Sequence, residues 1–260
     1  YTHQIEINSP LIHDSRWQFV HGNFRYLQNF MDYYGVQQID GLIADLGVSF
    51  HHFDEAERGF SFRFAGPLDM RMNREARISA ASVINTYDEE SLARVLYLYG
   101  EMPYGRPLAR KIIQAREQSP ITRIEQLLSV LISPTFPHEL PTGTELDIDS
   151  RYKKDLAKIF QALRIEVNDE LGALREMLVA AKGLLRPGGR IVVLTYHSLE
   201  DRIVKNFFRS GNLEGFIEKD FFGNIITPFQ VIEKGLTAST EEVAVNPRAR
   251  SAKLRVAEKI

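Results

Sequence analysis

The sequence predicts an α/β protein in which an all-helical insertion interrupts a Rossmann-like sheet. Two short apolar runs, at 41–45 and 190–195, have the length and composition of buried parallel strands. Polar side chains follow each run, as they do at the carboxyl edge of an open sheet, where such folds bind their ligands. Between the two runs, residues 73–158 show only helical patterns over a stretch too long for a loop. We therefore expect one domain made of residues 1–72 and 159–260, with a helical insertion at 73–158.

The composition favours a globular protein that needs no covalent crosslinks. The chain has 260 residues, 44% of them apolar, and it contains no cysteine. Disulfides and thiolate metal sites are therefore excluded. No apolar run approaches the roughly 18 residues that span a bilayer, so we expect a soluble, cytoplasmic protein without a membrane partner.

The charge distribution is more informative than the net charge. A net charge of −2 does not by itself indicate a nucleic-acid partner. Basic residues nevertheless outnumber acids at 105–116, 151–164 and 246–260. Such clusters are typical either of solvated faces or of a surface that contacts phosphates.

The amino-terminal part predicts strands and one helix. Residues 1–7 are strand-like, and residues 16–24 predict a strand that closes in a turn at Phe24. The Phe24 ring either packs in the core or covers a flat ligand. Residues 25–34 predict a helix that ends at Gly35.

Asp45 is the first candidate site residue, because it ends the first apolar run where a strand delivers a side chain to the sheet edge. An ordinary turn is the competing interpretation, since Asp and Gly also terminate strands. The following loop carries Asp69 and Arg71 among large apolar side chains that a solvated loop does not need. His51 and His52 are adjacent, but neighbours in an extended segment point in opposite directions and no third ligand is evident. We therefore predict no metal site.

The insertion predicts several amphipathic helices. Residues 104–115 and 121–131 have helical periodicity, and Ser82 or Asp88 is placed to cap the helices before them. Residues 136–150 are rich in Pro, Thr, Gly and Asp, which predicts a flexible excursion.

The carboxyl-terminal part predicts a long helix, a strand and a polar turn. Apolar residues repeat at helical spacing over 156–178, which predicts one continuous helix. A Pro-Gly-Gly turn at 187–189 then precedes the strand 190–195. His197 follows this strand, close to the strand that carries Asp45.

The segments after His197 predict a capped helix and a hairpin. Ser198, with Asp201 three residues later, forms a capping signature, so we expect Ser198 to cap a helix that runs to Phe208. Residues 216–234 predict a β-hairpin around a Gly-Asn turn.

Residues 246–256 alternate basic with small or apolar side chains, which predicts an edge strand with one charged face. Arg248 and Arg250 would then either contact phosphates or keep the edge soluble.

Five motifs occur in a fixed order along the chain. They are DLGVS at 45–49, ERGFSFR at 57–63, GPLDMRMN at 66–73, YHSLEDRIVK at 196–205 and NPRARSAKLR at 246–255. Together they resemble the RsmH (MraW) family of bacterial methyltransferases, which act on 16S ribosomal RNA. The resemblance covers nearly all of the chain. It implies a Rossmann-like methyltransferase sheet, S-adenosylmethionine as methyl donor, and N4 of a decoding-centre cytidine as acceptor.

The family's glycine-rich cofactor turn has no counterpart in the sequence. The family carries a Gly-Gly-His-type turn after its first strand, and sheet methyltransferases bind ribose with an acid after the second, yet no glycine precedes Gly22. Either cofactor binding is lost or the 260 residues omit a stretch. We expect an omission, because the first strand is central to such a sheet. Its removal would cost more than the roughly 5–15 kcal/mol by which a domain is stable.

The implied chemistry needs a hydrogen-bond acceptor beside the target amine. A cytosine amino group is a poor nucleophile because its lone pair is delocalised into the ring, so acceptors for its hydrogens must favour a pyramidal nitrogen. Many amino-methyltransferases place Asp, Asn or Ser before Pro-Pro-aromatic for this purpose, whereas Asp45 is followed by Leu-Gly-Val. We therefore expect His197 and the loop at Asp69 and Arg71 to hold the base.

The candidate site residues form three groups, and the insertion is the expected RNA-recognition domain. Catalytic roles are expected for Asp45, His197 and Asp69. The resemblance implies cofactor contacts for Phe24, Asp45 and His52, the last at a place that is usually Gln. Substrate contacts are expected for Arg71, Ser198, Arg248, Arg250, Arg106, Arg110 and Lys111.

The expected partner is 16S ribosomal RNA or the small ribosomal subunit, and a homodimer is left open. A DNA amino-methyltransferase would share the sheet and the cofactor, but it should show the Pro-Pro-aromatic motif. A non-catalytic RNA-binding or scaffold protein that has lost its cofactor loop would fit the amino-terminal residues. An oxidoreductase is disfavoured, because no Gly-x-Gly-x-x-Gly follows a strand.

Overall fold

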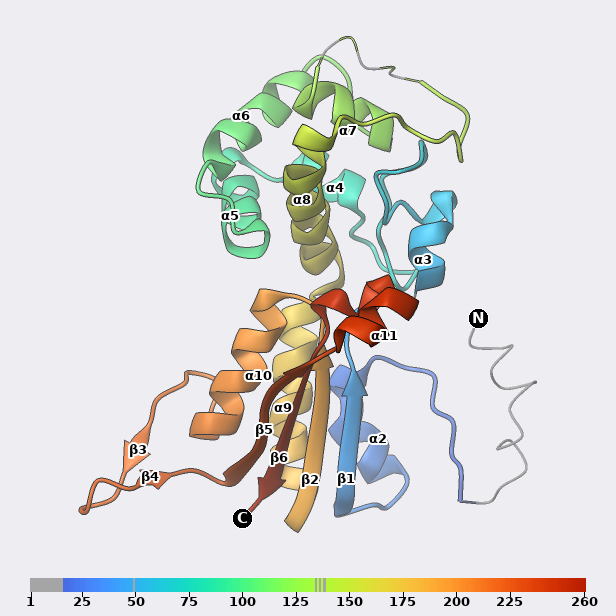
Figure 1. Cartoon of the computed structure of the whole chain (residues 1–260). Coiled ribbons are helices and arrows are strands. Elements are labelled where there is room, and N and C mark those ends of the chain that lie inside the picture. Colours follow the sequence, from blue (N-terminus) through green and yellow to red (C-terminus); the bar gives the residue numbers. More distant parts are fainter. Residues whose placement is uncertain (1–15, 49, 134, 136, 138) are drawn as a thin grey trace. The chain divides into compact units, whose positions relative to one another are not determined.

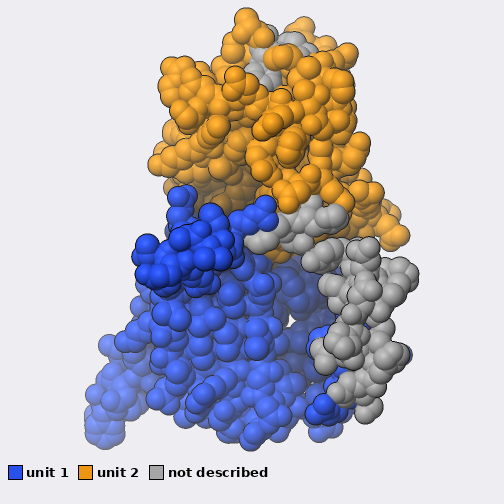
Figure 2. All heavy atoms as spheres, turned by 45° about the vertical axis from the view of Figure 1, so that its right-hand side comes forward, with its two compact units in different colours: residues 1–46, 171–260 blue, residues 47–170 orange. Residues whose placement is uncertain are grey.

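The computed structural model describes residues 16–48, 50–133, 135, 137 and 139–260. The strand predicted at 1–7 lies outside these residues. The chain divides into two compact units, which Figure 2 shows in different colours. Unit 1 consists of residues 1–46 and 171–260, and unit 2 consists of residues 47–170.

Unit 1 contains a four-stranded sheet with the strand order β1-β2-β6-β5 (Figure 1). The strands are β1 (Ile39–Asp45), β2 (Leu185–Thr195), β5 (Phe229–Thr237) and β6 (Lys253–Lys259). β1 and β2 are parallel, whereas β6 is antiparallel to both β2 and β5. The carboxyl ends of β1 and β2 therefore meet at one edge of the sheet. The predicted α/β class is confirmed.

Helices cover one face of this sheet. Among the described residues of unit 1, the helices are η2 (Phe24–Tyr26), α2 (Leu27–Tyr33), α9 (Glu170–Leu184), α10 (Ser198–Ser210), α11 (Thr240–Val245) and η4 (Pro247–Ser251). The covered face carries fully buried apolar side chains at every second position, among them Ile191 and Val193 of β2 and Ala257 of β6. They share one apolar cluster with Leu178 of α9 and Phe207 of α10. This cluster fixes the strands whose ends carry the site.

Unit 2 is helical and has a core of its own. Its helices are α3 (Phe50–Asp54), η3 (Ala56–Arg58), α4 (Ala80–Thr86), α5 (Glu89–Gly100), α6 (Gly105–Arg116), α7 (Ile124–Leu131) and α8 (Ser150–Asn168). Leu96, Leu127 and Leu163 are fully buried in this core. The helices predicted at 104–115 and 121–131 correspond to α6 and α7.

The helices α4 and α5 begin with side-chain caps. The Asp88 side chain accepts a hydrogen bond from the backbone N of Ser91 and caps α5, as predicted. Ser79 caps α4, and the other candidate, Ser82, is instead its partner in a capping box.

The two units divide at other positions than those expected. The divisions lie between residues 46 and 47 and between 170 and 171, instead of at 72/73 and 158/159. The loop before α4 belongs to unit 2, because Phe60, Leu68 and Met70 are buried in its core. The segment predicted as a flexible excursion also contributes, since Leu146 and Ile148 are buried there.

The continuous helix predicted over 156–178 is wrong, because α8 ends at Asn168 and α9 begins at Glu170. Asp169 between them has φ 46° and ψ 45°, a left-handed conformation that a right-handed helix cannot contain. Asp adopts this conformation at a lower cost than most residues.

Two predicted strands are also wrong. Residues 16–23, all of them described, contain no strand, and Phe24 begins η2. A strand forms only when another strand pairs with it, and the β-propensity of a segment does not show whether such a partner exists. Residues 246–256 do not form one edge strand. The first part is the helix η4, which begins at Pro247, because the fixed φ of proline suits the first position of a helix. The second part belongs to β6, which is not an edge strand because it pairs with both β2 and β5.

Other predicted elements are confirmed. The hairpin predicted within 216–234 forms from β3 (Glu218–Lys219) and β4 (Ile225–Ile226), which pair antiparallel around the turn at Gly223. Among the described residues, every helix is too short or too polar to span a bilayer.

Candidate functional site

Two side chains meet at the carboxyl edge of the sheet in unit 1. Asp45 is the last residue of β1, and Tyr196 directly follows β2, which pairs with β1 so that Asp45 lies beside Leu194. The Tyr196 hydroxyl donates a hydrogen bond to Oδ1 of Asp45 over 2.6 Å. Among the described residues, none donates to the other oxygen of this exposed carboxylate. Asp45 therefore presents one oriented acceptor oxygen to solvent.

Tyr196 remains a hydrogen-bond donor over the whole physiological pH range. Burial, the hydrogen bond to Asp45 and the negative charges of Asp45 and Glu200 raise the pKa of Tyr196 to about 12. Each of these causes disfavours the phenolate. The neutral hydroxyl can therefore hold the Asp45 carboxylate in one orientation.

His197 lies next to this pair and beside a buried acid. It occupies the N-cap position of α10, and its Nε2 lies 3.3 Å from Oε1 of Glu200 without forming a hydrogen bond. Glu200 is 3% exposed, and its other oxygen accepts the backbone N–H of Tyr196. Glu200 thus orients the turn that carries both side chains. The N-cap falls on His197 rather than on Ser198, which is the first residue of α10.

A buried ion pair ties the first turn of α10 to β6. The Arg255 guanidinium donates two hydrogen bonds to Asp201, of 2.7 and 3.0 Å, and Arg255 is only 8% exposed. Burial raises the pKa of the Asp201 carboxyl, but the hydrogen bonds and charge of Arg255 outweigh it and leave this pKa below its usual value. Asp201 is therefore ionised at neutral pH and holds the turn in place.

Asp69 and Arg71, the two site residues predicted in the loop of unit 2, bind each other. Both carboxylate oxygens of Asp69 accept hydrogen bonds from Arg71, of 2.9 and 2.7 Å. Arg71 also donates to the backbone oxygen of Ala76. Burial raises the pKa of Asp69, but the contacts with Arg71 outweigh it and lower this pKa overall. The pair thus braces the loop, and its predicted contacts with substrate remain a prediction.

Asn168 closes the same loop from the end of α8. Its Nδ2 donates to the backbone oxygen of Met70, and its Oδ1 accepts from the backbone N of Met72. The Arg58 guanidinium binds the backbone oxygens of Arg71 and Met72. These contacts satisfy the polar backbone of a loop whose apolar side chains are buried.

The residues expected to contact the cofactor lie in both units. Phe24 of η2 and Asp45 belong to unit 1, and the Phe24 ring is 41% exposed. His52 belongs to unit 2, where it lies in α3 rather than in a loop, and its ring centroid is 5.1 Å from that of Phe60.

The predicted phosphate contacts differ in their surroundings. Arg106 and Arg110 of α6 both form ion pairs with Glu89, at 3.3 and 3.0 Å, so part of their charge is already balanced. Lys111 has no ion pair among the described residues. Arg248 and Arg250 are exposed on η4 in unit 1.

The structure thus brings Asp45 and His197 to one sheet edge, as predicted, and places Asp69 and Arg71 together in unit 2. Sequence reasoning missed Tyr196 and Glu200. Tyr196 could have been found, because it stands at the carboxyl end of its strand as Asp45 does, and the ends of adjacent parallel strands lie side by side.

Comparisons with known proteins agree with the geometry. A sequence profile described as the MraW methylase family matches residues 6–260. Proteins named Ribosomal RNA small subunit methyltransferase H from Phocaeicola vulgatus and Bacteroides thetaiotaomicron are 58% and 54% identical to the chain over 250 residues. A protein of the same name from Porphyromonas gingivalis is 54% identical over 256 residues. Each of the three alignments covers 96% of this chain and 78% of the relative.

Proposed function

The chain belongs to the MraW methylase family, and we propose that it methylates N4 of a cytidine in the decoding centre of 16S ribosomal RNA. The family uses S-adenosylmethionine, so the chain is an S-adenosylmethionine-dependent methyltransferase. Small-subunit ribosomal RNA is the substrate class that the names of its relatives give. The decoding-centre cytidine as the target nucleotide and N4 as the target atom are our proposals.

The hydrogen bond between Tyr196 and Asp45 is the observation that carries this proposal. A cytosine N4 amine needs an acceptor that draws one of its hydrogens away and makes the nitrogen pyramidal. The second oxygen of Asp45 is such an acceptor, and Tyr196 fixes its direction. A carboxylate held in this way lowers the barrier without first having to reorient.

The residues of unit 1 fit the chemistry of the cofactor. S-adenosylmethionine supplies an electrophilic methyl group on a positively charged sulfonium. The exposed Asp45 carboxylate complements this charge, and the exposed Phe24 ring offers an apolar surface for an adenine. We assign cofactor contacts to Phe24, Asp45 and His52, and the described residues contain no glycine-rich turn before β1.

We propose roles for the remaining site residues. His197, which follows Tyr196 in the turn that Glu200 holds, binds the cytosine ring. Asp69 has a catalytic role and fixes Arg71, which contacts the substrate. Ser198 and the basic residues contact the RNA backbone; they are Arg248, Arg250, Arg106, Arg110 and Lys111.

The test is methyl transfer from S-adenosylmethionine labelled in its methyl group. The protein is incubated with assembled small subunits, with naked 16S RNA and with duplex DNA, and the products are digested to nucleosides and identified by mass spectrometry. We expect N4-methylcytidine from RNA at one decoding-centre position and no label in DNA. Label on another nucleoside or at another position would overturn the proposal, and labelled DNA would favour a DNA amino-methyltransferase.

The role of His197 has its own test. His197→Ala should leave the affinity for S-adenosylmethionine, measured by calorimetry, intact. The rate of single-turnover methylation should fall at least tenfold, roughly the effect of losing one aligned group at a reacting centre. An unchanged rate would reject the role. A wild-type protein that does not bind S-adenosylmethionine would instead support the non-catalytic alternative.

A further inference from the structure

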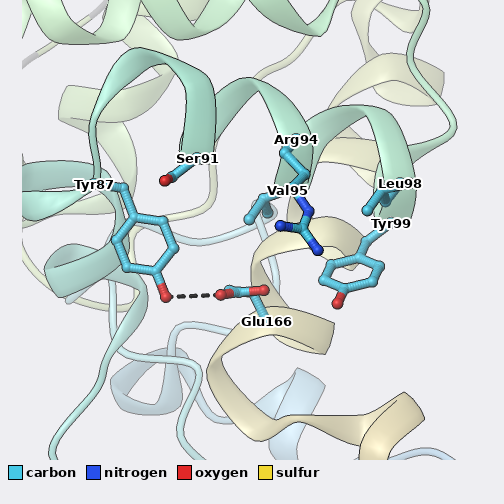
Figure 3. A pocket seen from close by; sticks show the side chains of 7 residues that line it. All are labelled: Tyr87, Ser91, Arg94, Val95, Leu98, Tyr99 and Glu166. Atoms are coloured by element: carbon cyan, nitrogen blue, oxygen red, sulfur yellow. Dashed lines mark hydrogen bonds between the residues drawn. The ribbon is translucent and has the colours of Figure 1, made fainter.

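A pocket in unit 2 has no role in the function proposed above. It has a volume of about 360 Å³. Its lining consists of residues of α5, Tyr87 just before that helix, and Glu166 in the last turn of α8 (Figure 3). This size is in the range of small-molecule sites. Its lining belongs entirely to unit 2 and includes none of the residues assigned so far.

The floor of the pocket presents a carboxylate with one oxygen to spare. The Tyr87 hydroxyl donates a hydrogen bond to Oε1 of Glu166 over 2.7 Å. Burial, this hydrogen bond and the charge of Glu166 raise the pKa of Tyr87 to about 12, so the hydroxyl stays protonated and holds the carboxylate. Oε2 of Glu166 accepts no hydrogen bond from any described residue.

A cation lines the same pocket without neutralising that acid. Arg94 extends from α5, and Figure 3 shows its guanidinium and the Glu166 carboxylate pointing into the space between the rings of Tyr87 and Tyr99. Arg94 forms no ion pair or hydrogen bond with any residue that the structure describes. Opposite charges that share a pocket and yet do not pair leave room for a ligand with donors on one edge and acceptors on the next.

Among nucleobases, guanine has this pattern. Its N1–H and N2–H groups form a pair of donors that match a carboxylate, while its adjacent O6 and N7 are the acceptors to which arginine binds in its commonest specific base contact. Adenine and cytosine place a ring acceptor next to their single amino group, and uracil flanks its one N–H with two carbonyls. A carboxylate repels each of these acceptors. Tyr87 and Tyr99 line the pocket, and aromatic rings are the side chains on which unpaired bases stack.

We propose that this pocket binds one unpaired guanine of the RNA substrate, with Glu166 reading N1–H and N2–H and Arg94 reading O6 and N7. The inference rests on the proposed function in taking RNA as the ligand. The base must leave its duplex or lie in a single strand, because the base edges are hidden in duplex RNA.

The first test uses mononucleotides and the whole chain. Binding of guanosine 5′-monophosphate is measured by calorimetry and compared with binding of inosine 5′-monophosphate, which lacks only the N2 amine, and with the adenosine, cytidine and uridine monophosphates. We expect guanosine monophosphate to bind at least tenfold more tightly than each of the others. Equal affinity for guanosine and inosine monophosphates, or no saturable binding of guanosine monophosphate, would overturn the proposal.

Matched variants locate the site. Glu166→Gln keeps an acceptor for Tyr87 but no longer matches two donors, so the preference for guanosine over inosine monophosphate should disappear. Arg94→Ala should weaken guanosine monophosphate binding at least fivefold. Glu90→Gln and Arg77→Ala, at exposed positions outside the pocket, should leave binding unchanged. A preference that survives in Glu166→Gln, with folding confirmed by circular dichroism, would overturn the proposal.

The methylation assay separates this inference from the proposed function. Glu166→Gln and Arg94→Ala should raise the KM for RNA at least threefold and leave kcat unchanged, because neither residue is assigned a role in the methyl-transfer step. Unchanged KM values would overturn the role of the pocket in substrate binding, even in an active enzyme. A protein that selects guanosine monophosphate but methylates no RNA would refute the proposed function and leave guanine binding established.

Discussion

The hydrogen bond between Tyr196 and Asp45 fixes the orientation of the carboxylate on which the proposed chemistry depends. A carboxylate on a free side chain rotates, and each reorientation during the reaction raises the barrier. The Tyr196 hydroxyl removes that freedom with a charge-assisted hydrogen bond of 2.6 Å. Tyr196 is in this account a positioning residue that acts through Asp45.

Replacing Tyr196 by Phe should therefore slow methyl transfer and leave binding almost unchanged. A hydrogen bond to a charged group is worth about 1.5–3 kcal/mol, so we expect kcat to fall about tenfold or more. The KM for RNA should change less than twofold. Tyr33→Phe, at a tyrosine that is 82% exposed, is the matched control and should have no effect. A rise in KM together with a fall in kcat and a loss of folding would point to a merely structural role.

Sequence reasoning found the charged members of the site but not their partners. Asp45 and His197 could be predicted, because each follows an apolar run and the ends of parallel strands meet. Tyr196 was missed because an aromatic residue after a strand is more often core than site. The contact between Asp69 and Arg71 depends on how the loop folds, which the residue types alone do not determine.

At the level of elements, the ion pair between Asp201 and Arg255 holds the site turn to the sheet. Asp201→Asn removes the charge but keeps the shape, and leaves Arg255 buried without its anion. We expect the free energy of unfolding in urea to fall by about 2–3 kcal/mol. Asp40→Asn is the control, because its pair with Arg186 is exposed and should contribute less than about 1 kcal/mol.

The pH dependence of this difference follows from the lowered pKa of Asp201. A carboxyl whose pKa is lower in the folded state stabilises the protein above its unfolded pKa of about 3.9. That contribution is lost as the pH falls through the folded pKa. The difference between wild type and Asp201→Asn should thus be full at neutral pH and shrink below about pH 4. A difference that grows on acidification would contradict the assignment.

The helices and strands that could be predicted are those whose pattern is local. Helical periodicity located α5, α6 and α7, and the Gly-Asn turn located the hairpin of β3 and β4. Periodicity could not reveal the break at Asp169, because the apolar spacing continues across it while one backbone conformation reverses hand. The strand predicted at 16–24 failed because pairing depends on neighbours far away in the sequence.

At the level of the whole molecule, the chain has two separate apolar cores, and this predicts how it unfolds. The core of unit 1 contains Phe207, and that of unit 2 contains Leu128. Calorimetry should show two transitions, because separate cores unfold as separate cooperative units. Leu128→Ala, which should cost about 2–5 kcal/mol, should lower the midpoint of one transition, and Phe207→Ala should lower the other. A single transition that both variants shift equally would contradict this division.

The division into units was the least predictable feature of the molecule. The motif-bearing loop before α4 looks like part of the sheet domain, because it continues the strand that ends at Asp45. Its assignment to unit 2 depends on Phe60, Leu68 and Met70 entering a core formed by helices that come later in the chain. Only the folded chain reveals such a long-range burial.

The central claim is that Asp45, oriented by Tyr196, accepts a hydrogen from the target amine during methyl transfer. It is tested most directly by single-turnover methylation of small-subunit ribosomal RNA with Asp45→Asn, compared with the exposed control Asp40→Asn at the other end of β1. The account predicts a loss of about a hundredfold or more for Asp45→Asn, the effect of removing one charged group from the reacting centre, and none for the control. A rate for Asp45→Asn within twofold of wild type, with the cofactor still bound, would contradict it.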